Sequence, residues 1–277
     1  MARTNKNDQH PGMDREQKRV MFDNMNFAAA EAYKLLRTNL MFSLPEKPCR
    51  VIGVTSSVRG EGKSTTSLNL AYTIAQSGKH VLLIDGDLRL PTVHSKLGIP
   101  AAPGLSNLLA GLNIERDCRR PSGYYDNWFV LPSGDIPPNP SELLGSQRMQ
   151  ILLEKYAQSF DFIILDLPPV NIVADAMVLA PWLDGLILAV RQNYTSSKEL
   201  DACMYQIRKI GSRFLGFVMT DATVDKAGGR YGHYGNKYAR EDYGYGDGGS
   251  GKHQDAFFKA AAGSGESAAA KEQNSEE

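Results

Sequence analysis

Cysteine is scarce in this sequence, and long apolar runs are missing. The 277 residues include 3 cysteines, Cys49, Cys118 and Cys203, which are isolated and lack metal-ligand spacing. This pattern predicts reduced thiols in a reducing compartment. Apolar stretches stay well below the roughly 20 residues of a membrane-spanning helix, and the polar N-terminus lacks the apolar segment of a signal peptide. A cytoplasmic location is therefore expected.

An excess of charge of either sign is also missing. The formal net charge is +0, which gives no overall attraction to nucleic acid or to an anionic membrane, and no nucleic-acid partner is expected. Hydrophobic residues make up 42% of the chain and charged residues 22%, which is ordinary for a protein that buries a core. The length suits one large α/β domain or two small ones.

The most informative motif is a glycine-containing loop between an apolar run at 51–54 and a helical pattern that begins near Leu68. Its Gly-Lys-Ser core is that of a phosphate-binding P-loop, with Ser57 in place of the first glycine. Glycines let the backbone approach phosphate oxygens, and the amides and helix dipole attract them. Lys63 places a charge near the β- and γ-phosphates, and the Ser64 hydroxyl suits Mg²⁺. The nucleotide-binding candidates are Ser57, Gly60, Glu61, Gly62, Lys63, Ser64 and Thr65. Taken alone, the imperfect motif also fits a plain glycine-rich turn.

Two further apolar segments end in carboxylates. Residues 80–84 lead into Asp85 and Asp87, and residues 162–165 lead into Asp166. Ligands of open parallel sheets bind where strands reach their carboxyl ends. Asp166 has the position of a Walker B aspartate that orients Mg²⁺, directly or through water. The prolines after it, Pro168 and Pro169, oppose a helix-capping role. For Asp85 and Asp87 the alternative is a polar loop, although an acidic pair beside a polyphosphate needs a metal.

Strand-like and helix-like segments alternate along the chain. This alternation predicts an α/β fold with a doubly wound, mostly parallel sheet. We expect 116–126 to be a loop. The expected strands are 51–54, 80–84, 128–131, 162–165, 185–190 and, as the last core strand, 214–220. The expected helices are 27–42, the one after the P-loop, a short one from Gly104, 141–157 with a break near Gly145, 174–180 and 198–210.

Composition divides the chain into three parts. Residues 1–25 are predicted to be a flexible arm, 26–225 the folded domain, and 226–277 a disordered tail rich in tyrosine and glycine. Glycine and serine linkers do not need tyrosine, so the tyrosines are interpreted either as a sticky docking segment or as hydroxyl groups offered to an active site. They are Tyr231, Tyr234, Tyr238, Tyr243 and Tyr245.

Charged residues recur every three positions in the helix predicted at 27–42. Glu31, Lys34 and Arg37 share a face of that helix. Spacing alone favours a solvated face with weak ion pairs, and the alternative is a contact with a neighbouring subunit.

Together these motifs resemble the bacterial protein-tyrosine kinases (BY-kinases), a P-loop family with a deviant Walker A motif that is associated with capsular and exopolysaccharide biosynthesis. Residues 57–65 resemble its Walker A motif, 84–89 its Walker A′ motif and 162–169 its Walker B motif. Arg59 stands where the family often has proline. Glu31, Lys34 and Arg37 resemble its E-x-x-R-x-x-R subunit contact, with lysine at the middle position.

The resemblance implies an enzyme that uses ATP and Mg²⁺ to phosphorylate its own tail tyrosines in trans within a ring, commonly an octamer. It also implies a transmembrane adaptor that recruits the chain to the inner face of the membrane, protein-tyrosine substrates and a cognate phosphotyrosine phosphatase. Ser64, Asp87 and Asp166 are the expected metal ligands. Asp85 is the expected base for the tyrosine hydroxyl, assisted by Arg89, although Asp85 and Asp87 can exchange roles. The expected catalytic residues are Lys63, Asp85, Asp87 and Asp166.

Two other functions compete with this one. A partitioning or positioning ATPase usually carries a second lysine early in the P-loop, and this chain has no lysine between Ser57 and Lys63. Such proteins also usually lack a tyrosine tail. A nucleotide-binding scaffold that regulates a polysaccharide polymerase would have no catalytic activity. Thr220 and Asp221 are candidate contacts for the adenine base.

Overall fold

The computed structural model describes residues 25–222. These residues belong to the first of two compact units, Met1–Thr223, and the second unit is Val224–Glu277. The predicted N-terminal arm and the predicted tyrosine tail lie almost wholly outside the described residues. Within the described part, none of the helices has the length and apolar character needed to cross a membrane.

A seven-stranded sheet forms the centre of the described part, with the strand order β3-β4-β2-β5-β1-β6-β7. Neighbouring strands run parallel except β3, which pairs antiparallel with β4. The predicted doubly wound, mostly parallel sheet is confirmed. The strands are β1 (Arg50–Ser56), β2 (Val81–Asp85), β3 (Arg120–Pro121), β4 (Trp128–Leu131), β5 (Phe162–Asp166), β6 (Gly185–Arg191) and β7 (Phe214–Thr220).

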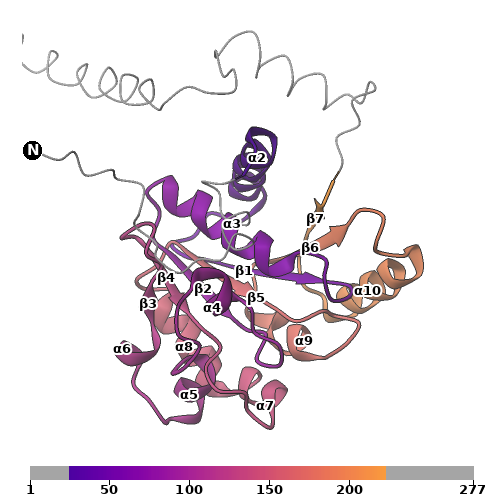
Figure 1. Cartoon of the computed structure of the whole chain (residues 1–277). Helices are drawn as coiled ribbons and strands as arrows, with labels where there is room; N and C mark the ends of the chain where they lie inside the picture. Colours follow the sequence, from indigo (N-terminus) through magenta and orange to yellow (C-terminus); the bar gives the residue numbers. More distant parts are fainter. Residues whose placement is uncertain (1–24, 223–277) are drawn as a thin grey trace, which may run out of the picture. The chain divides into compact units, whose positions relative to one another are not determined.

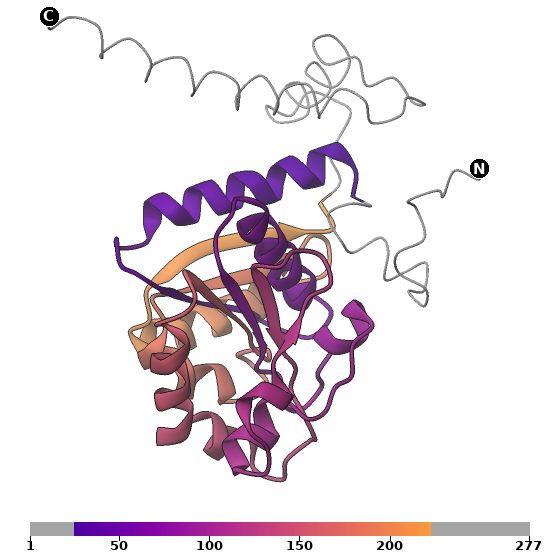
Figure 2. The same ribbon diagram turned by 90° about the vertical axis from the view of Figure 1, so that its left-hand side faces the viewer.

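Helices cover both faces of this sheet (Figure 1). Two long ones, α2 (Phe27–Ser43) and α3 (Lys63–Gln76), lie on one side, and Figure 2 shows α2 along the outside of that layer. The other helices are α4 (Val93–Leu97), α5 (Leu105–Ala110), α6 (Glu115–Cys118), α7 (Pro140–Leu144), α8 (Gln147–Tyr156), α9 (Asp175–Leu179), the 3₁₀ helix η2 (Ala180–Trp182) and α10 (Ser197–Ile210).

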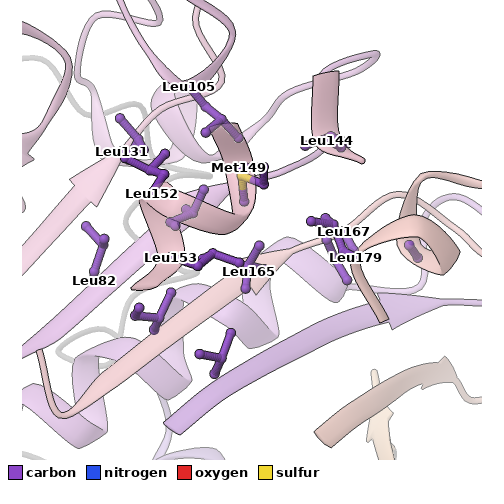
Figure 3. Close-up of a cluster of buried hydrophobic side chains, with 14 of the residues drawn as sticks. Leu82, Leu105, Leu131, Leu144, Met149, Leu152, Leu153, Leu165, Leu167 and Leu179 are labelled. Carbon is purple, nitrogen blue, oxygen red and sulfur yellow. The ribbon is translucent and has the colours of Figure 1, made fainter. Parts of the chain in front are cut away.

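The central strands send alternate side chains into two hydrophobic clusters. In β5, Ile163 and Leu165 join the cluster on the α8 side, and Phe162 and Ile164 join the cluster on the α3 side. Figure 3 shows the first cluster, where leucines from α8 pack over Leu82 and Leu165 of the strands. Because both faces are covered, the central strands carry runs of four or more consecutive apolar residues before their polar carboxyl ends, which is the pattern that the sequence shows.

Some elements differ from the sequence-based expectations. The stretch 116–126, expected as a loop, contains most of α6 and the two-residue strand β3. The last strand, expected in the core, is an edge strand: Phe217 is 53% exposed and Met219 63% exposed. Helix α4 was not expected at all. All four elements are short or lie at the edge of the fold, where alternation of apolar and polar residues carries little information.

Candidate functional site

The carboxyl ends of three strands meet beside the first turn of α3. Strand β5 lies between β1 and β2, and the strand register places Asp166 level with Val54 on one side and with Asp85 on the other. The P-loop follows β1 and runs directly into α3, whose first residue is Lys63. The chain reverses its direction of winding next to β1, which is the point where open α/β sheets bind ligands.

Two glycines give the P-loop its shape. Gly60 and Gly62 have φ angles of +80° and +84°, in the left-handed region that favours glycine. A Cβ atom on Gly62 would also lie 3.1 Å from Thr220 Cγ2. The loop can therefore turn tightly into α3 and leave its amides and the positive end of the helix dipole beside the cavity described below.

Lys63 is held between two carboxylates. Its ammonium lies 2.9 Å from Asp87 Oδ2 and 3.6 Å from Asp166 Oδ2. Burial alone would lower the pKa of Lys63, but the charges of Asp166 and Asp87 outweigh it, so the pKa is raised and the ammonium form persists. The predicted meeting of Lys63 with carboxylates from β2 and β5 is thereby found in the structure.

Asp166 has the features of a ligand for Mg²⁺. It is fully buried, and Ser67 Oγ donates a hydrogen bond to its Oδ1 at 3.1 Å. Its Oδ2 atom is buried without a hydrogen-bond partner. Burial raises the pKa of Asp166 despite the opposing charge of Lys63, and a divalent cation would favour the ionised form. Ser64 is the residue after Lys63, and its hydroxyl oxygen lies 3.3 Å from the Lys63 ammonium.

The described residues contain no cluster of three acidic, histidine or cysteine side chains suited to a metal ion. This finding is compatible with Mg²⁺, because Mg²⁺ at nucleotide sites takes only one or two carboxylates and completes its shell with phosphates and water. Ser64 and Asp166 therefore fit the ion as the protein's share of the ligands.

Asp85 differs from its neighbour Asp87. It is fully buried, and its carboxylate accepts hydrogen bonds from the amides of Asp87 at 3.3 Å and of Val93 at 3.2 Å. Burial, and then the charge of Asp166, raise the pKa of Asp85 well above the ordinary range of a carboxylic acid. Asp85 thus fixes the turn between β2 and α4, whereas Asp87 lines the cavity.

A cavity of about 420 Å³ opens over the P-loop. Part of its lining comes from the P-loop and the start of α3, with Asp87. The apolar part of the lining, which we name the apolar wall, consists of Leu90, Pro168, Pro169, Ile172 and Val173. Three further basic or polar residues complete the lining besides Arg59 in the P-loop: Arg89, Thr92 and Lys96.

Arg89 is engaged with a buried acid beyond the cavity. Its guanidinium donates to both oxygens of Asp175, at 2.9 and 3.1 Å, and to Ser141 Oγ at 3.1 Å. The hydrogen bond to Asp175 raises the pKa of Arg89. These hydrogen bonds tie the β2–α4 loop to α7 and α9. The guanidinium that was expected to assist the base is therefore already held by Asp175 and Ser141.

Sequence reasoning missed a brace that holds the P-loop from behind. The buried carboxylate of Glu61 accepts hydrogen bonds from the Val58 amide at 2.8 Å and from the Thr195 hydroxyl. Thr220, a candidate adenine contact, instead donates to the Glu61 carbonyl at 2.7 Å. Ser57 is also fully buried. A glutamate inside a glycine-rich loop was the one available signal, and two of its partners, Thr195 and Thr220, lie 134 and 159 positions away.

The other adenine candidate also has a partner within the chain. Asp221 accepts two hydrogen bonds from Arg191, at 3.1 and 2.9 Å. Arg191 further donates to the Gly60 carbonyl at 3.4 Å. Side chains at the ends of β6 and β7 therefore support the P-loop backbone.

The charged face of α2 separates into two parts. Lys34 pairs with Glu31 at 2.6 Å on the exposed side. Arg37 turns inward and donates to the Thr73 carbonyl of α3 at 2.7 Å. The three residues are thus close in space, and one of them already serves the packing of α2 on α3.

The sheet, the P-loop and the carboxylates define the chain as a P-loop nucleotide-binding protein. In agreement, residues 49–216 match the AAA domain family. The tyrosine-protein kinase YwqD of Bacillus subtilis (strain 168) is 37% identical over 208 residues, which cover 75% of this chain and 87% of YwqD. The crystal structure of the chimerical protein CapA2B2 is 35% identical with a TM-score of 0.66, covering 69% of this chain and 83% of that one. The chain belongs to the bacterial tyrosine-protein kinase family and is an enzyme of that class.

The septum site-determining protein MinD of Pyrococcus horikoshii OT3 shares the fold only. It is 24% identical, with a TM-score of 0.52, and the match covers 62% of this chain and 70% of MinD. The positioning ATPases, which were the competing class, therefore have the same fold as this chain.

Proposed function

We propose that this chain is an ATP-dependent protein-tyrosine kinase that phosphorylates the tyrosines of its C-terminal tail in trans and thereby regulates capsular or exopolysaccharide synthesis. The observation that carries the proposal is the position of Lys63, held by Asp87 and Asp166 beside a cavity that opens over the P-loop. Membership of the tyrosine-kinase family supports the choice of a tyrosine hydroxyl as the acceptor.

In this proposal the P-loop amides and Lys63 hold the phosphates of ATP and stabilise the charge that develops on the γ-phosphoryl group. Ser64 and Asp166 hold Mg²⁺, with Asp87 beside them. When bound, Mg²⁺ neutralises charge on the β- and γ-phosphates. The side chains needed for these tasks lie within one turn of α3 and two strand ends.

The transfer step follows from the same geometry. The tyrosine oxygen forms a bond to the γ-phosphorus while the bond between that phosphorus and the ADP oxygen breaks. The phenolic proton passes to a carboxylate. Sequence reasoning favoured Asp85 for this role, but Asp85 is enclosed and bonded to two amides, whereas Asp87 lines the cavity. We therefore assign the proton to Asp87 and the shaping of the turn to Asp85.

The proposal includes partners. Copies of the chain would assemble into a ring through the face of α2 that carries Glu31 and Lys34, and a transmembrane adaptor would recruit them to the inner face of the membrane. A phosphotyrosine phosphatase would reset the tail. The family resemblance supports these three elements.

The test is incubation of the full-length protein with ATP and Mg²⁺, read by an anti-phosphotyrosine blot and by phosphate release. We expect labelling that is lost in Lys63→Met and in a variant with phenylalanine at all five tail tyrosines. Phosphate release without labelling would indicate the positioning ATPase instead, and neither signal would indicate a scaffold.

A further inference from the structure

Several basic residues line the cavity over the P-loop, and most of them already interact within the chain. Lys63 lies between two carboxylates, and Arg89 donates hydrogen bonds to both oxygens of Asp175. Lys96 on α4 also has an interaction within the chain. These three residues are therefore engaged, in whole or in part, before a ligand binds.

Arg59 differs from these three residues. It is exposed on the P-loop next to Gly60, and it lines the same cavity. Within residues 25–222, its guanidinium has no hydrogen bond, ion pair or ring contact. A guanidinium stays charged at any ordinary pH, because its pKa lies above 12. The positive charge of Arg59 is thus available to an anion that enters the cavity.

A bound triphosphate places negative charge in this cavity, and the need for positive charge increases during phosphoryl transfer. The transition state spreads charge over the three equatorial oxygens of the transferred group. Lys63 is the P-loop cation at these phosphates, but Asp87 and Asp166 oppose its charge. An arginine without another partner can add positive charge through a planar fork that matches two phosphoryl oxygens.

Arg59 and Asp87 border the same cavity. In the proposed transfer, Asp87 takes the proton of the tyrosine whose oxygen attacks the γ-phosphorus, so the γ-phosphoryl group has to lie in the space that both residues border. The apolar wall borders this cavity as well. Apolar surroundings lower the effective dielectric constant, which strengthens the attraction between a guanidinium and a phosphoryl oxygen.

We propose that Arg59 is a further catalytic residue, which contacts the γ-phosphoryl group of ATP and stabilises the charge that develops on it during transfer. This inference rests on the proposed function and adds to it a residue that acts on the transition state. The tyrosine oxygen bonds to the γ-phosphorus, the bond from that phosphorus to the ADP oxygen breaks, and the phenolic proton passes to Asp87. Arg59 keeps its own protons and acts through its charge and its hydrogen bonds.

The kinetics of full-length variants test this assignment first. In Arg59→Gln, kcat for tyrosine phosphorylation should fall by about 10²- to 10³-fold, the range for loss of one donor at a developing charge. KM for ATP should change by less than about threefold, because the contact acts mainly in the transition state. Arg59→Lys keeps the charge without the fork and should recover part of the lost rate.

Arg208→Gln is the matched control, because Arg208 is an exposed arginine of α10 outside the cavity lining. It should keep the kcat of the unmodified protein. Urea unfolding of Arg59→Gln checks its fold, and the midpoint should stay close to that of the unmodified protein, since the Arg59 side chain is exposed.

Two nucleotide complexes separate a catalytic role from a structural one. ADP with aluminium fluoride imitates the transferring phosphoryl group, and ADP with beryllium fluoride imitates the ground state. By calorimetric titration, Arg59→Gln should bind the aluminium complex about 10²-fold more weakly. It should bind the beryllium complex and ADP alone as the unmodified protein does. A structural role of Arg59 would weaken all three.

Three results would overturn the inference and leave the proposed function standing. They are an unchanged kcat in Arg59→Gln, equal weakening of all three nucleotide complexes, and a lower rate of labelling with unchanged affinity for the aluminium complex. The third result would place Arg59 at the acceptor polypeptide instead of at the phosphoryl group. Absence of labelling in the unmodified protein would overturn the proposed function and this assignment together.

Discussion

At the scale of the residue, the site depends on a few positions with no acceptable substitute. Gly62 combines a left-handed backbone with a neighbour, Thr220, that leaves little space for a Cβ atom. Glu61 is buried behind the loop and bonded to Val58 and Thr195. The loop's shape thus comes from one position that needs glycine and one that needs a carboxylate.

Gly62→Ala should destabilise the protein by about 1–2 kcal/mol for the left-handed backbone, plus a further contribution from the contact with Thr220. The matched control is Gly211→Ala, because Gly211 has a φ of +69° but nothing within 4 Å of an added Cβ. Urea unfolding of both variants separates the two costs. Equal destabilisation would show that the contact with Thr220 is relieved without cost.

Glu61→Ala should lower the free energy of unfolding by about 1–3 kcal/mol, because it leaves the partly buried amide of Val58 without its acceptor. Affinity for ATP should also fall, since the loop loses its brace. Glu154→Ala is the control, because Glu154 is exposed on α8 and bonds only the side chain of Gln150 in the described structure. Denaturant unfolding and nucleotide titration provide the two readings. Similar values for the two variants would argue against the brace.

Buried thiols give a pH dependence of known sign. Burial raises the pKa of Cys49 and of Cys203 to about 11. A thiol whose pKa is raised on folding holds its proton more firmly in the folded state, so its full stabilising effect is present below the unfolded pKa, near 9, and is lost as the pH rises toward 11. The free energy of unfolding should therefore fall across this window.

Comparison with Cys203→Ala isolates the share of one thiol, since lysines and tyrosines also titrate in this range. The decline from pH 9 to 11 should be smaller in the variant by up to about 2 kcal/mol. Guanidinium unfolding at a series of pH values measures it. An identical slope in both proteins would contradict the proposed effect of burial.

At the scale of the element, α2 packs on the sheet with one side and has a second, exposed side, and its sequence does not distinguish the two. Leu40 and Leu44, at its C-terminal end, are buried in the hydrophobic cluster that α3 forms with the sheet. Arg37 donates a hydrogen bond to the Thr73 carbonyl. Phe42, in contrast, is 86% exposed. The inner side of α2 belongs to the fold of the single chain, and the outer side remains for the predicted contact with another copy.

Arg37→Ala should therefore lower the free energy of unfolding by about 1.5–3 kcal/mol, the range for a hydrogen bond from a charged donor. Glu31→Ala, on the exposed side, should leave stability nearly unchanged and weaken assembly. Unfolding curves and analytical ultracentrifugation distinguish the two effects. Loss of assembly without loss of stability in Arg37→Ala would show that this residue serves the subunit contact instead.

The central elements could be predicted from the sequence because burial on both faces leaves an unmistakable mark. Four apolar residues before Asp166 indicate a covered strand, and Gly-Lys-Ser after another such run indicates where phosphate binds. Asp85 shows the limit of this reasoning. Its place at the end of β2 was predicted, but its enclosure by the amides of Asp87 and Val93 depends on the turn into α4, which leaves no periodic pattern.

Contacts distant in sequence set the other limit. The distant partners of Glu61 and Gly60 are Arg191 and Thr220, at the ends of β6 and β7, and Thr195, in the loop after β6. Nothing in the local sequence of Thr195 or Thr220 indicates a role at the P-loop. The exposure of β7 at the edge of the sheet could not be predicted either, because its apolar residues resemble those of a core strand.

At the scale of the whole molecule, the proposal predicts that phosphorylation weakens the ring. Each phosphate adds about −1.5 to −2 charges at neutral pH, so five modified tyrosines would make tails that converge on neighbouring sites repel one another. Sedimentation before and after incubation with ATP measures the change. The variant with phenylalanine at the five tail tyrosines is the control and should sediment alike in both conditions. Equal assembly of modified and unmodified protein would refute this step.

The central claim is that the site of one copy transfers phosphate to the tail of another. It is tested most directly by mixing two full-length variants with ATP and Mg²⁺: Lys63→Met, which keeps its tail, and the five-phenylalanine variant, which keeps its site. We predict phosphotyrosine on the Lys63→Met chain in the mixture and on neither variant alone. An unlabelled Lys63→Met chain in the mixture, with phosphate release continuing, would contradict the account.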